Sequence, residues 1–573
     1  ARQSKGRGTA RMAAPKNILF IMFDQLRWDY LSCYGHPHLQ TPNLDRLASK
    51  GMRFDRCTIQ SPLCGPSRMS TYTGRYVHSH GASWNNVPLK VGELTMGDHL
   101  RDLGMGCWLV GKTHMAADAE GMRRLGLEPD SVIGARVSEC GFDIFERDDG
   151  MRPEGPDGLY DEGGALKYNE YLRGKGYDSD NPWHDYANSG LDDDGNVLSG
   201  WFLENSDRPA NIREEDSETP YLTRRGIEFI EQAKGPWCCH LSYIKPHWPY
   251  IVPEPYASMY GPQDFLPRIA SEAERETDHP VFKGFQNAPV GKALARDEVR
   301  EKVLRAYMGL IKQCDDQMGV LFDFLERTGR MEDTLIVVTS DHGDFMGDHW
   351  MGEKTFFHEA SVKVPLIVYD PSPEADATRG TSSDALVECI DFLPTFVEVA
   401  GGKPAKLDHI LEGQSLLPML RGGAAPERKV VVCEYDYSSS PLAGRLGLHP
   451  DQSRMFMVAD HDWKMIHFES GHRPMLFDLK NDPHELEDLG ASEAHADVRA
   501  RMYDRLHAWA RRPAARTTMS NDAFVKERTA GPGRTGVLIG IVEETELPKE
   551  ITAKYTGRKA RDMRGGRPGA PGE

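Results

Sequence analysis

The apolar run at residues 18–23 is the feature that most constrains the fold of this chain. It is too short to cross a membrane, and a run of this length and composition is typical of a strand buried on both faces of a parallel sheet. The run ends directly in Asp24 and Gln25. Because α/β sheets bind ligands at the carboxyl ends of their parallel strands, this polar pair predicts a functional site at that edge.

An apolar run followed by polar residues recurs further along the chain. Strand-like runs at 106–110, 237–243 and 334–339 each lead into charged side chains, and helical patterns separate them. Alternation of helices with buried strands predicts an α/β fold with a large mixed, mostly parallel sheet flanked by helices. The predicted helices are residues 41–51, 94–103, 220–233, 297–328 and 384–400, and the further strands of this sheet are 52–57 and 364–369.

The C-terminal part has a different pattern. Strand-like runs at 430–435, 455–459 and 463–468 follow one another without helices, which predicts a smaller antiparallel sheet, and a helix is expected at 497–511. Residues 117–215 and 252–295 are predicted to be irregular. The expected organisation is an N-terminal extension (1–15), a catalytic α/β domain (16–425), an α+β subdomain (426–512) and a C-terminal extension (513–573) with a flexible basic tail from about 554.

Composition excludes several classes of partner. The formal charge of -18 argues against nucleic acid as the main ligand, because phosphate contacts need clustered Lys and Arg. No apolar run is long enough to span a bilayer, so no membrane partner is expected. The ten cysteines are scattered, which is typical of a reducing compartment, and residues 1–16 lack the apolar stretch of a signal peptide. We therefore expect a cytoplasmic protein.

Cys64 lies in a turn that leads into a predicted helix ending near Gly74. A cysteine in such a place is often a small buried residue, and it can also be a thiolate nucleophile that the helix N-terminus activates. A cysteine loop that cradles phosphate would carry arginine six residues after the cysteine, but position 70 is Ser and the arginine is Arg68. The local pattern leaves the first two interpretations open.

The polar ends of the strands at 18–23 and 334–339 form a plausible metal site. Asp24, Gln25, Asp341 and His342 offer mostly oxygen ligands of the kind that one divalent cation, Ca²⁺ or Mn²⁺, accepts. A two-metal site would need further Asp and His ligands, and the segment before His247 lacks their spacing. One metal ion is therefore expected.

Five basic side chains could supply positive charge and proton-transfer groups: Arg68, Lys112, His114, His247 and Lys354. Each lysine taken alone is more often a solvated surface charge. Gathered at one sheet edge, they would hold an anionic tetrahedral group and move protons. This set favours a small anionic ester as the substrate.

Two of these motifs resemble a known family. The sequence Cys64-Gly-Pro-Ser-Arg68 resembles the formylglycine signature of sulfatases, and Gly111-Lys112-Thr-His114 resembles their Gly-Lys-x-His motif. The resemblance covers roughly residues 16–510 and implies an alkaline phosphatase-like fold. It is closest to the branch of arylsulfatases and phosphonate monoester hydrolases, on the pairs Asp24-Gln25 and Asp341-His342.

The resemblance also implies cofactors and roles. Cys64 would be oxidised to formylglycine by a formylglycine-generating enzyme, and its hydrate would be the nucleophile. The implied metal ligands are Asp24, Gln25, Cys64, Asp341 and His342. The implied catalytic residues are Cys64, Arg68, Lys112, His114, His247 and Lys354, and the substrate-binding residues are Asn85, Lys112, His247 and Lys354. Members of this branch are commonly oligomeric, so a homodimer or homotetramer is expected.

The expected activity is hydrolysis of sulfate monoesters of the aryl sulfate type, with promiscuous hydrolysis of phosphonate monoesters and phosphodiesters. Phosphonate monoester hydrolases tend to carry Tyr and Thr where this chain has Lys112 and His114, which favours sulfate. Three alternatives stay open: a phosphonate monoester hydrolase or phosphodiesterase, an alkyl sulfatase resembling choline sulfatases, and an inactive binding protein with this fold.

Overall fold

The computed structural model describes residues 15–85, 87–150, 166–529, 540–553 and 555–556. The chain divides into two compact units, one made of Ala1–Pro404 with Ile410–Pro513 and the other of Ala405–His409 with Ala514–Glu573. All ten cysteines lie in the described part and are free thiols. Among the described helices, none has the length and apolar character needed to cross a membrane.

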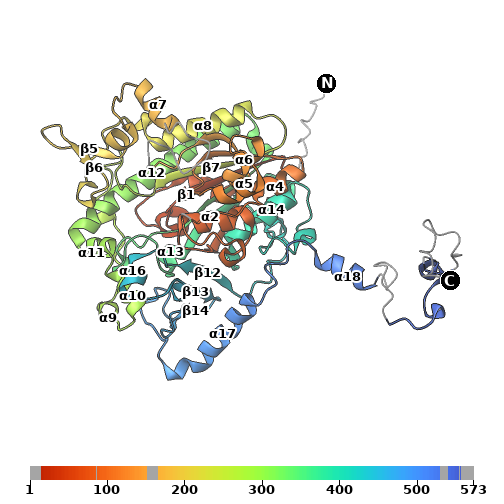
Figure 1. Ribbon diagram of the computed structural model, residues 1–573. Helices are drawn as coiled ribbons and strands as arrows, with labels where there is room; N and C mark the ends of the chain where they lie inside the picture. The colour runs from red at the N-terminus through yellow and green to blue at the C-terminus, as the bar shows by residue number, and fades with distance from the viewer. Residues whose placement is uncertain (1–14, 86, 151–165, 530–539, 554, 557–573) are drawn as a thin grey trace, which may run out of the picture. The chain divides into compact units, whose positions relative to one another are not determined.

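A nine-stranded sheet forms the centre of the first unit (Figure 1). Its order is β10-β2-β9-β8-β1-β7-β3-β4, with β11 beside β2, and β9 runs antiparallel to both of its neighbours while the other pairs are parallel. The strands are β1 (Asn17–Asp24), β2 (Met52–Thr58), β3 (Gly106–Gly111), β4 (Asp143–Arg147), β7 (Trp237–Pro246), β8 (Thr334–Ser340), β9 (Lys363–Tyr369), β10 (Thr381–Ser383) and β11 (Val387–Glu388).

β1 is a central strand because both of its faces are apolar. Leu19, Ile21 and Phe23 point into the core shared with α1 (Pro42–Lys50), α8 (Glu218–Gln232) and α12 (Asp297–Arg327). On the opposite face Phe20 packs edge-on against two rings of the segment that forms α14 (Phe392–Val399). α2 (Cys64–Thr73) and α4 (Met96–Asp102) lie on this second face with α14 (Figure 1).

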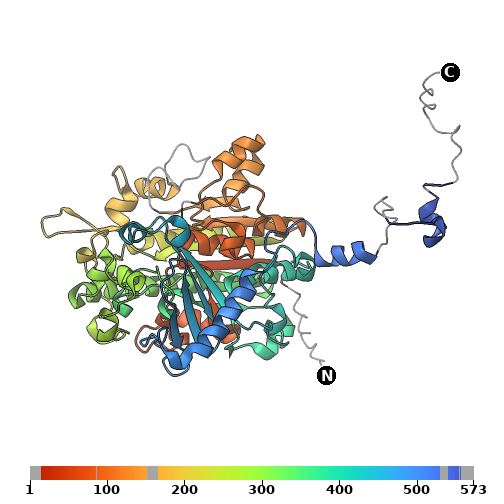
Figure 2. The same cartoon turned by 60° about the horizontal axis from the view of Figure 1, so that its bottom comes forward.

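A four-stranded antiparallel sheet follows in the chain (Figures 1 and 2). It consists of β12 (Val431–Asp436), β13 (Arg454–Ala459), β14 (Trp463–Phe468) and β15 (Met475–Asp478), covered by α17 (Ala496–Ala510). Its apolar face shares one core cluster with Tyr76 and Ile390, which belong to the segments around the large sheet. The predicted fold class, a mostly parallel mixed sheet with a smaller antiparallel sheet, is confirmed.

The structure corrects three predictions. Residues 117–215 are not irregular throughout: they contain helices α5 (Ala119–Leu125), α6 (Val132–Ser138) and α7 (Lys167–Gly174), the edge strand β4 and the hairpin of β5 (Ser189–Leu191) and β6 (Val197–Ser199). Residues 252–295 include α9 (Glu272–Arg275), α10 (Pro280–Gln286) and α11 (Pro289–Leu294). Most of the predicted basic tail from 554 lies outside the described residues.

The third correction concerns the helix expected at 384–400, which begins only at Phe392. Val387 and Glu388 pair with β2 instead, and the buried Glu388 side chain accepts a hydrogen bond from the backbone N–H of Val432. Tertiary pairing of the backbone thus overrides a helical pattern at this position.

Gly111 ends β3 and sets the position of Lys112. Its φ is +113°, and a Cβ at this position would lie 1.9 Å from the carbonyl oxygen of Ser242 on the neighbouring β7. The same oxygen accepts a hydrogen bond of 3.1 Å from the N–H of Lys112. Only glycine permits this close approach of two strands.

We expect Gly111→Ala to lower the free energy of unfolding by about 3 kcal/mol or more, because backbone strain adds to a clash with main-chain atoms. Gly104→Ala is the matched control, since Gly104 also has a positive φ of +81° but nothing within 4 Å of its Cβ position; its expected cost is about 1–2 kcal/mol. Urea unfolding measures both, and equal losses in the two variants would show that the contact with β7 is unimportant.

Candidate active site

The carboxyl ends of β1 and β8 place four predicted site residues together. The two strands are parallel neighbours with Phe23 opposite Ser340, so Asp24 and Gln25 emerge beside Asp341 and His342. The N–H of Gln25 donates a hydrogen bond of 3.1 Å to Asp341 Oδ1. The register of the sheet therefore brings the ends of β1 and β8 level, and the residues that directly follow them meet there.

Cys64 is the first residue of α2 and faces the same group. Its Sγ lies 3.1 Å from His342 Nε2, 3.3 Å from Lys354 Nζ and 3.8 Å from Asp24 Oδ1. The side chain is only 1% exposed. The helix N-terminus and the basic side chains together make this position favourable for a negatively charged atom.

The charges around Cys64 confirm this character. Burial alone would raise the pKa of the Cys64 thiol, but Lys354, His342 and Lys112 outweigh it and hold the pKa well below its usual value. A hydrogen bond with the His114 side chain lowers the pKa of the thiol further. The same field would stabilise an oxyanion attached at this position.

Asp24 is a fully buried carboxylate held by two cations. Lys112 Nζ lies 2.6 Å and Arg68 Nη2 3.3 Å from Asp24 Oδ2, and Arg68 Nε donates to Asp341 Oδ2 at 2.8 Å. Burial by itself would raise the pKa of Asp24, as would Cys64, but the positive charges of Lys112 and Arg68 hold it below the usual carboxylate range. Asp24 is therefore ionised, and its second oxygen is available for another ligand.

Three acceptor atoms converge beside Cys64. His342 Nδ1 lies 2.9 Å from the carbonyl oxygen of Gly343, which keeps a ring proton on Nδ1, so Nε2 is the nitrogen that would lose its proton to bind a cation. That Nε2 faces Asp24 Oδ1 at 3.5 Å and Asp341 Oδ1 at 3.6 Å. Bonds of about 2.4 Å to Ca²⁺ would place neighbouring ligands roughly 3.4 Å apart, so these residues fit a divalent cation.

Gln25 lies beside this group with a fixed amide. Its Oε1 accepts a hydrogen bond of 3.2 Å from Lys354 Nζ, and its Nε2 donates to the hydroxyl of Tyr250 at 2.8 Å and to Asp344 Oδ2. Tyr250 in turn donates to Asp344 at 2.6 Å. This network assigns the amide oxygen, rather than the nitrogen, to the side of Cys64.

His247 and Lys354 form a second pair at the edge of the group. Lys354 Nζ lies 3.1 Å from His247 Nε2, and His247 Nδ1 lies 2.8 Å from the carbonyl oxygen of Trp248. Burial lowers the pKa of His247 to about 3, with Lys354 adding to the effect. The imidazole is thus neutral, with its proton on Nδ1, and Nε2 accepts from the lysine ammonium.

The two remaining predicted residues, His114 and Asn85, lie beside Cys64 and Gly65. The backbone N–H of His114 is held by Asp149 Oδ1 at 3.0 Å, and its buried Nδ1 makes no hydrogen bond within the described part of the chain. Asn85 Oδ1 accepts a hydrogen bond of 3.0 Å from the N–H of Gly65. All residues singled out in the sequence therefore lie around Cys64.

Several supporting residues carry no clear signal in the sequence. Ser242 bonds Arg68 Nη1 at 2.7 Å, and Tyr250 and Asp344 orient Gln25. Asp344 follows the Asp-His pair by two residues and could have been suspected from that spacing. In the sequence, Ser242 looks like an ordinary residue inside a strand and Tyr250 like an aromatic residue of a loop. Their contacts with the site follow only from the three-dimensional structure.

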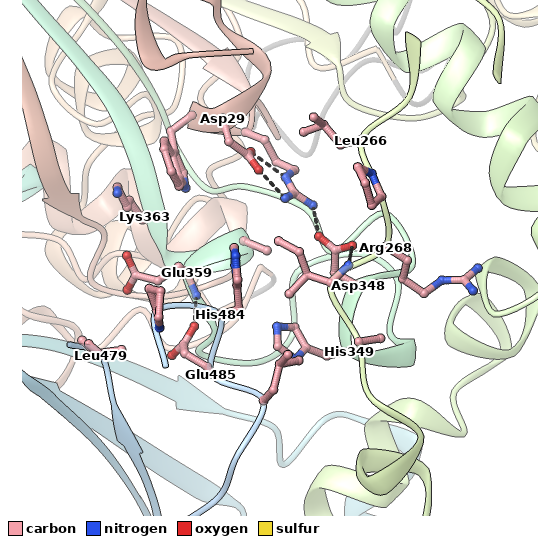
Figure 3. Close-up of a pocket in the computed structure, with 18 of the residues that line it drawn as sticks. Asp29, Leu266, Arg268, Asp348, His349, Glu359, Lys363, Leu479, His484 and Glu485 are labelled. Atoms are coloured by element: carbon pink, nitrogen blue, oxygen red, sulfur yellow. Dashed lines mark hydrogen bonds and ion pairs between the residues drawn. The ribbon is translucent and has the colours of Figure 1, made fainter. Parts of the chain in front are cut away.

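A cavity of about 770 Å³ has a different set of lining residues (Figure 3). It is lined by Arg27, Trp28, Asp29 and Lys363, among others, and none of the predicted site residues contributes to its wall. This cavity is therefore not the candidate active site, although it is large.

Comparison with known proteins identifies the family. A profile of the family described as Sulfatase matches residues 16–138 and 167–402, more than half of the chain, and one described as N-sulphoglucosamine sulphohydrolase, C-terminal, matches residues 347–512. The chain belongs to the sulfatase family, within the alkaline phosphatase-like superfamily. The resemblance stated from the motifs is confirmed, and members of this family are hydrolases.

Individual relatives agree over most of the chain. A multifunctional alkaline phosphatase superfamily protein, PehA, from Trinickia caryophylli is 31% identical over 84% of this chain and 92% of its own length. An arylsulfatase from Clostridium perfringens is 26% identical over 84% of this chain and 91% of its own. A phosphonate monoester hydrolase from Silicibacter pomeroyi superposes with a TM-score of 0.75 at 27% identity, covering 88% of this chain and 98% of that one.

We expect Tyr250→Phe to lower kcat/KM about tenfold, because it removes the hydroxyl that fixes the Gln25 amide without touching a reacting atom. Tyr243→Phe is the matched control: its hydroxyl bonds Thr223 at 2.8 Å on the α8 side of the sheet. Both variants should lose about 1 kcal/mol of unfolding free energy for the lost hydrogen bond. Steady-state kinetics and urea unfolding separate the two effects, and equal kcat/KM in both variants would exclude a positioning role for Tyr250.

Proposed function

We propose that this chain hydrolyses sulfate monoesters of the aryl sulfate type, with one divalent cation and a formylglycine made from Cys64. The observation that carries the proposal is the position of residue 64. Its Sγ lies at the first turn of α2, 3.1 Å from His342 Nε2 and 3.3 Å from Lys354 Nζ, beside the two carboxylates. A nucleophile held there would be adjacent to the cation and to a proton donor.

Each cofactor supplies a specific chemistry. Asp24, Gln25, Asp341 and His342, together with residue 64, would hold the cation, Ca²⁺ or Mn²⁺, which when bound polarises a sulfuryl oxygen and lowers the pKa of a coordinated hydroxyl group. The hydrate of formylglycine offers two hydroxyl groups on one carbon, so one can be esterified while the other allows release of sulfate by C–O cleavage.

The chain's own residues then orient the groups and move the protons. Arg68 and Lys112 hold the Asp24 carboxylate and keep a positive potential beside residue 64. The ammonium of Lys354 donates toward His247 Nε2, which gives a route for a proton to the leaving oxygen. His114, whose side chain hydrogen-bonds Cys64, is the candidate base for the release of sulfate.

Sulfate is placed first because Lys112 and His114 are the residues that sulfatases resembling this chain carry. A phosphonate monoester is the second candidate. It is favoured by the superposition on the Silicibacter pomeroyi phosphonate monoester hydrolase and by the identity with the multifunctional PehA. Sulfate monoesters and phosphonate monoesters both carry a tetrahedral centre with one negative charge, so one site can accept both.

The formation of formylglycine needs a partner. At the Cβ of Cys64 the thiol leaves as sulfide and one oxygen atom enters, which is a two-electron oxidation. A formylglycine-generating enzyme that uses dioxygen as the oxidant, with two reducing equivalents for its second oxygen atom, balances this step. Such an enzyme is the one protein partner that the proposal requires.

We expect the peptide that contains Cys64 to be lighter by about 18 Da than its unmodified mass, because the aldehyde replaces the thiol and one hydrogen. Mass spectrometry of protein from a host that has the converting enzyme measures this, and the Cys57 peptide of the same digest is the control. Cys64→Ala should lower kcat/KM at least a thousandfold. An unmodified Cys64 in fully active protein would falsify the proposed nucleophile, whereas an unmodified and inactive protein would favour the binding-protein alternative.

We expect kcat/KM for an aryl sulfate to exceed that for an aryl phosphonate monoester with the same leaving phenol. Matched phenols keep the leaving-group pKa constant, so the ratio reports the contacts with the tetrahedral group. The ratio should fall in Lys112→Tyr/His114→Thr, which installs the residues that the phosphonate enzymes tend to carry. A wild-type preference for the phosphonate would reverse the order of the two candidate substrates.

A further inference from the structure

A second cluster of metal-ligating side chains lies outside the catalytic group. It consists of Glu274 of α9, His349 of the short turn η8 (Asp348–Trp350) and His358, the residue before α13 (Glu359–Val362). One ligand atom from each of the three lies within 4.8 Å of the other two, and the side chains are only 7%, 2% and 1% exposed. None of the three contacts Cys64.

His358 is the unusual member of the cluster. Both of its ring nitrogens are buried and have no hydrogen-bond partner among the described residues. Burial lowers the pKa of His358 well below its usual value, so the ring is neutral and carries a free lone pair. The ring is surrounded by phenyl rings at centroid distances of 5.4–5.7 Å, those of Phe282, Phe345, Phe356 and Phe477. In such surroundings a phenylalanine would fit without leaving polar atoms unsatisfied.

The other two members are held in place for ligation. His349 Nδ1 lies 2.6 Å from Glu274 Oε1, and the ring of His349 stacks on that of His358 with centroids 3.8 Å apart. The second carboxylate oxygen of Glu274 accepts a hydrogen bond of 2.7 Å from the N–H of Ser271. Supporting hydrogen bonds of this kind orient metal-binding side chains in proteins.

The backbone of His349 is also fixed. Its φ is +53°, a conformation that only a minority of residues other than glycine adopt. Its N–H donates to the carbonyl oxygen of Ile269 at 2.7 Å, and its own carbonyl oxygen accepts from Gln286 Nε2 at 3.1 Å. The surrounding structure thus directs this imidazole toward Glu274 and His358.

We propose that Glu274, His349 and His358 bind a zinc ion, separate from the catalytic cation. Two imidazoles and one carboxylate form a ligand set that suits Zn²⁺, with a water molecule as the fourth ligand. Zinc bonds of about 2.0–2.1 Å need ligand atoms roughly 3.3 Å apart, so the contact between His349 and Glu274 opens by less than 1 Å and the proton on Nδ1 is released. The oxygen-rich catalytic group prefers harder cations.

The ion has both a route of entry and a structural role. His349, one of the three proposed ligands, lines the 770 Å³ cavity together with Asp348, so the cluster borders this cavity through His349 (Figure 3). The positive charge of Lys464 helps to lower the pKa of His358, and this lysine is itself paired with Glu359 and Glu485 at 2.7 Å each. In the sequence, Lys354 lies between the two histidines. Zinc would therefore anchor both ends of the segment that brings Lys354 to Cys64.

The test uses the full-length chain with Cys64→Ala, which removes the thiolate from the catalytic group. Chelator-treated protein is dialysed against Zn²⁺ in excess Ca²⁺, and bound zinc is measured by inductively coupled plasma mass spectrometry. We expect one zinc ion per chain and a rise in Tm on the order of 2–4 °C. In His358→Phe, which matches the surrounding rings in shape, zinc affinity should fall at least 100-fold and Tm should no longer respond.

Glu274→Gln provides a second variant if His358→Phe does not fold, with the same loss of zinc expected. Asp341→Asn is the matched control, because it alters the catalytic group and should retain the zinc. Co²⁺ gives an independent readout, since a tetrahedral site should show visible absorption that disappears in Glu274→Gln. Absence of stoichiometric zinc in the parent protein, or unchanged zinc binding in both cluster variants, would overturn the proposal and leave His358 as a stacked core residue.

Discussion

The buried carboxylate of Asp24 is the interaction on which the rest of the site depends. It ends the central strand β1 with no exposure to solvent, and an unpaired charge there would cost several kcal/mol. Lys112, from the end of β3, and Arg68, from the second turn of α2, supply the compensating charges. Arg68 also reaches Asp341, the residue that follows β8. Each partner comes from a different element. The charge of Asp24 is therefore compensated only when the strands and α2 have assembled.

The reversed strand β9 completes this arrangement. If β9 were parallel to β8, the connection would have to return to the amino ends of the strands before β9 began. Because β9 is antiparallel, the connection stays at the carboxyl end of β8. The segment between β8 and β9 therefore stays beside the carboxyl ends of the strands, and it contains Asp344, Lys354 and the two histidines of the proposed zinc site. The site is thus built from three parts: the ends of the parallel strands, the N-terminus of α2 and the segment between β8 and β9. The antiparallel direction of β9 is what keeps this segment at the site.

Sequence reasoning located the parts of the site that depend on strand ends and missed those that depend on tertiary contact. Asp24, Lys112 and Asp341 each follow an apolar run, so the pattern itself marks them. Tyr250 and Ser242 have no such mark, because their partners Gln25 and Arg68 are distant in the sequence. The same reason explains the strand pairing of Val387, where a helix was predicted, and the edge strand β4, whose short run lies within a polar stretch. The periodicity of apolar residues in the sequence indicates which residues are buried, but it does not indicate which buried residues contact one another.

The burial of Cys64 has a consequence for timing. A side chain that is 1% exposed in the folded protein is inaccessible to another enzyme, so any conversion of Cys64 must come before folding is complete. Lys354, which closes the site over the sulfur, is 290 residues further along the chain. At translation rates of about 5–20 residues per second, roughly 15–60 s pass between the synthesis of the two residues. Within that interval Cys64 has been synthesised but the site that buries it has not formed, so a modifying enzyme would have access to the cysteine only during this time.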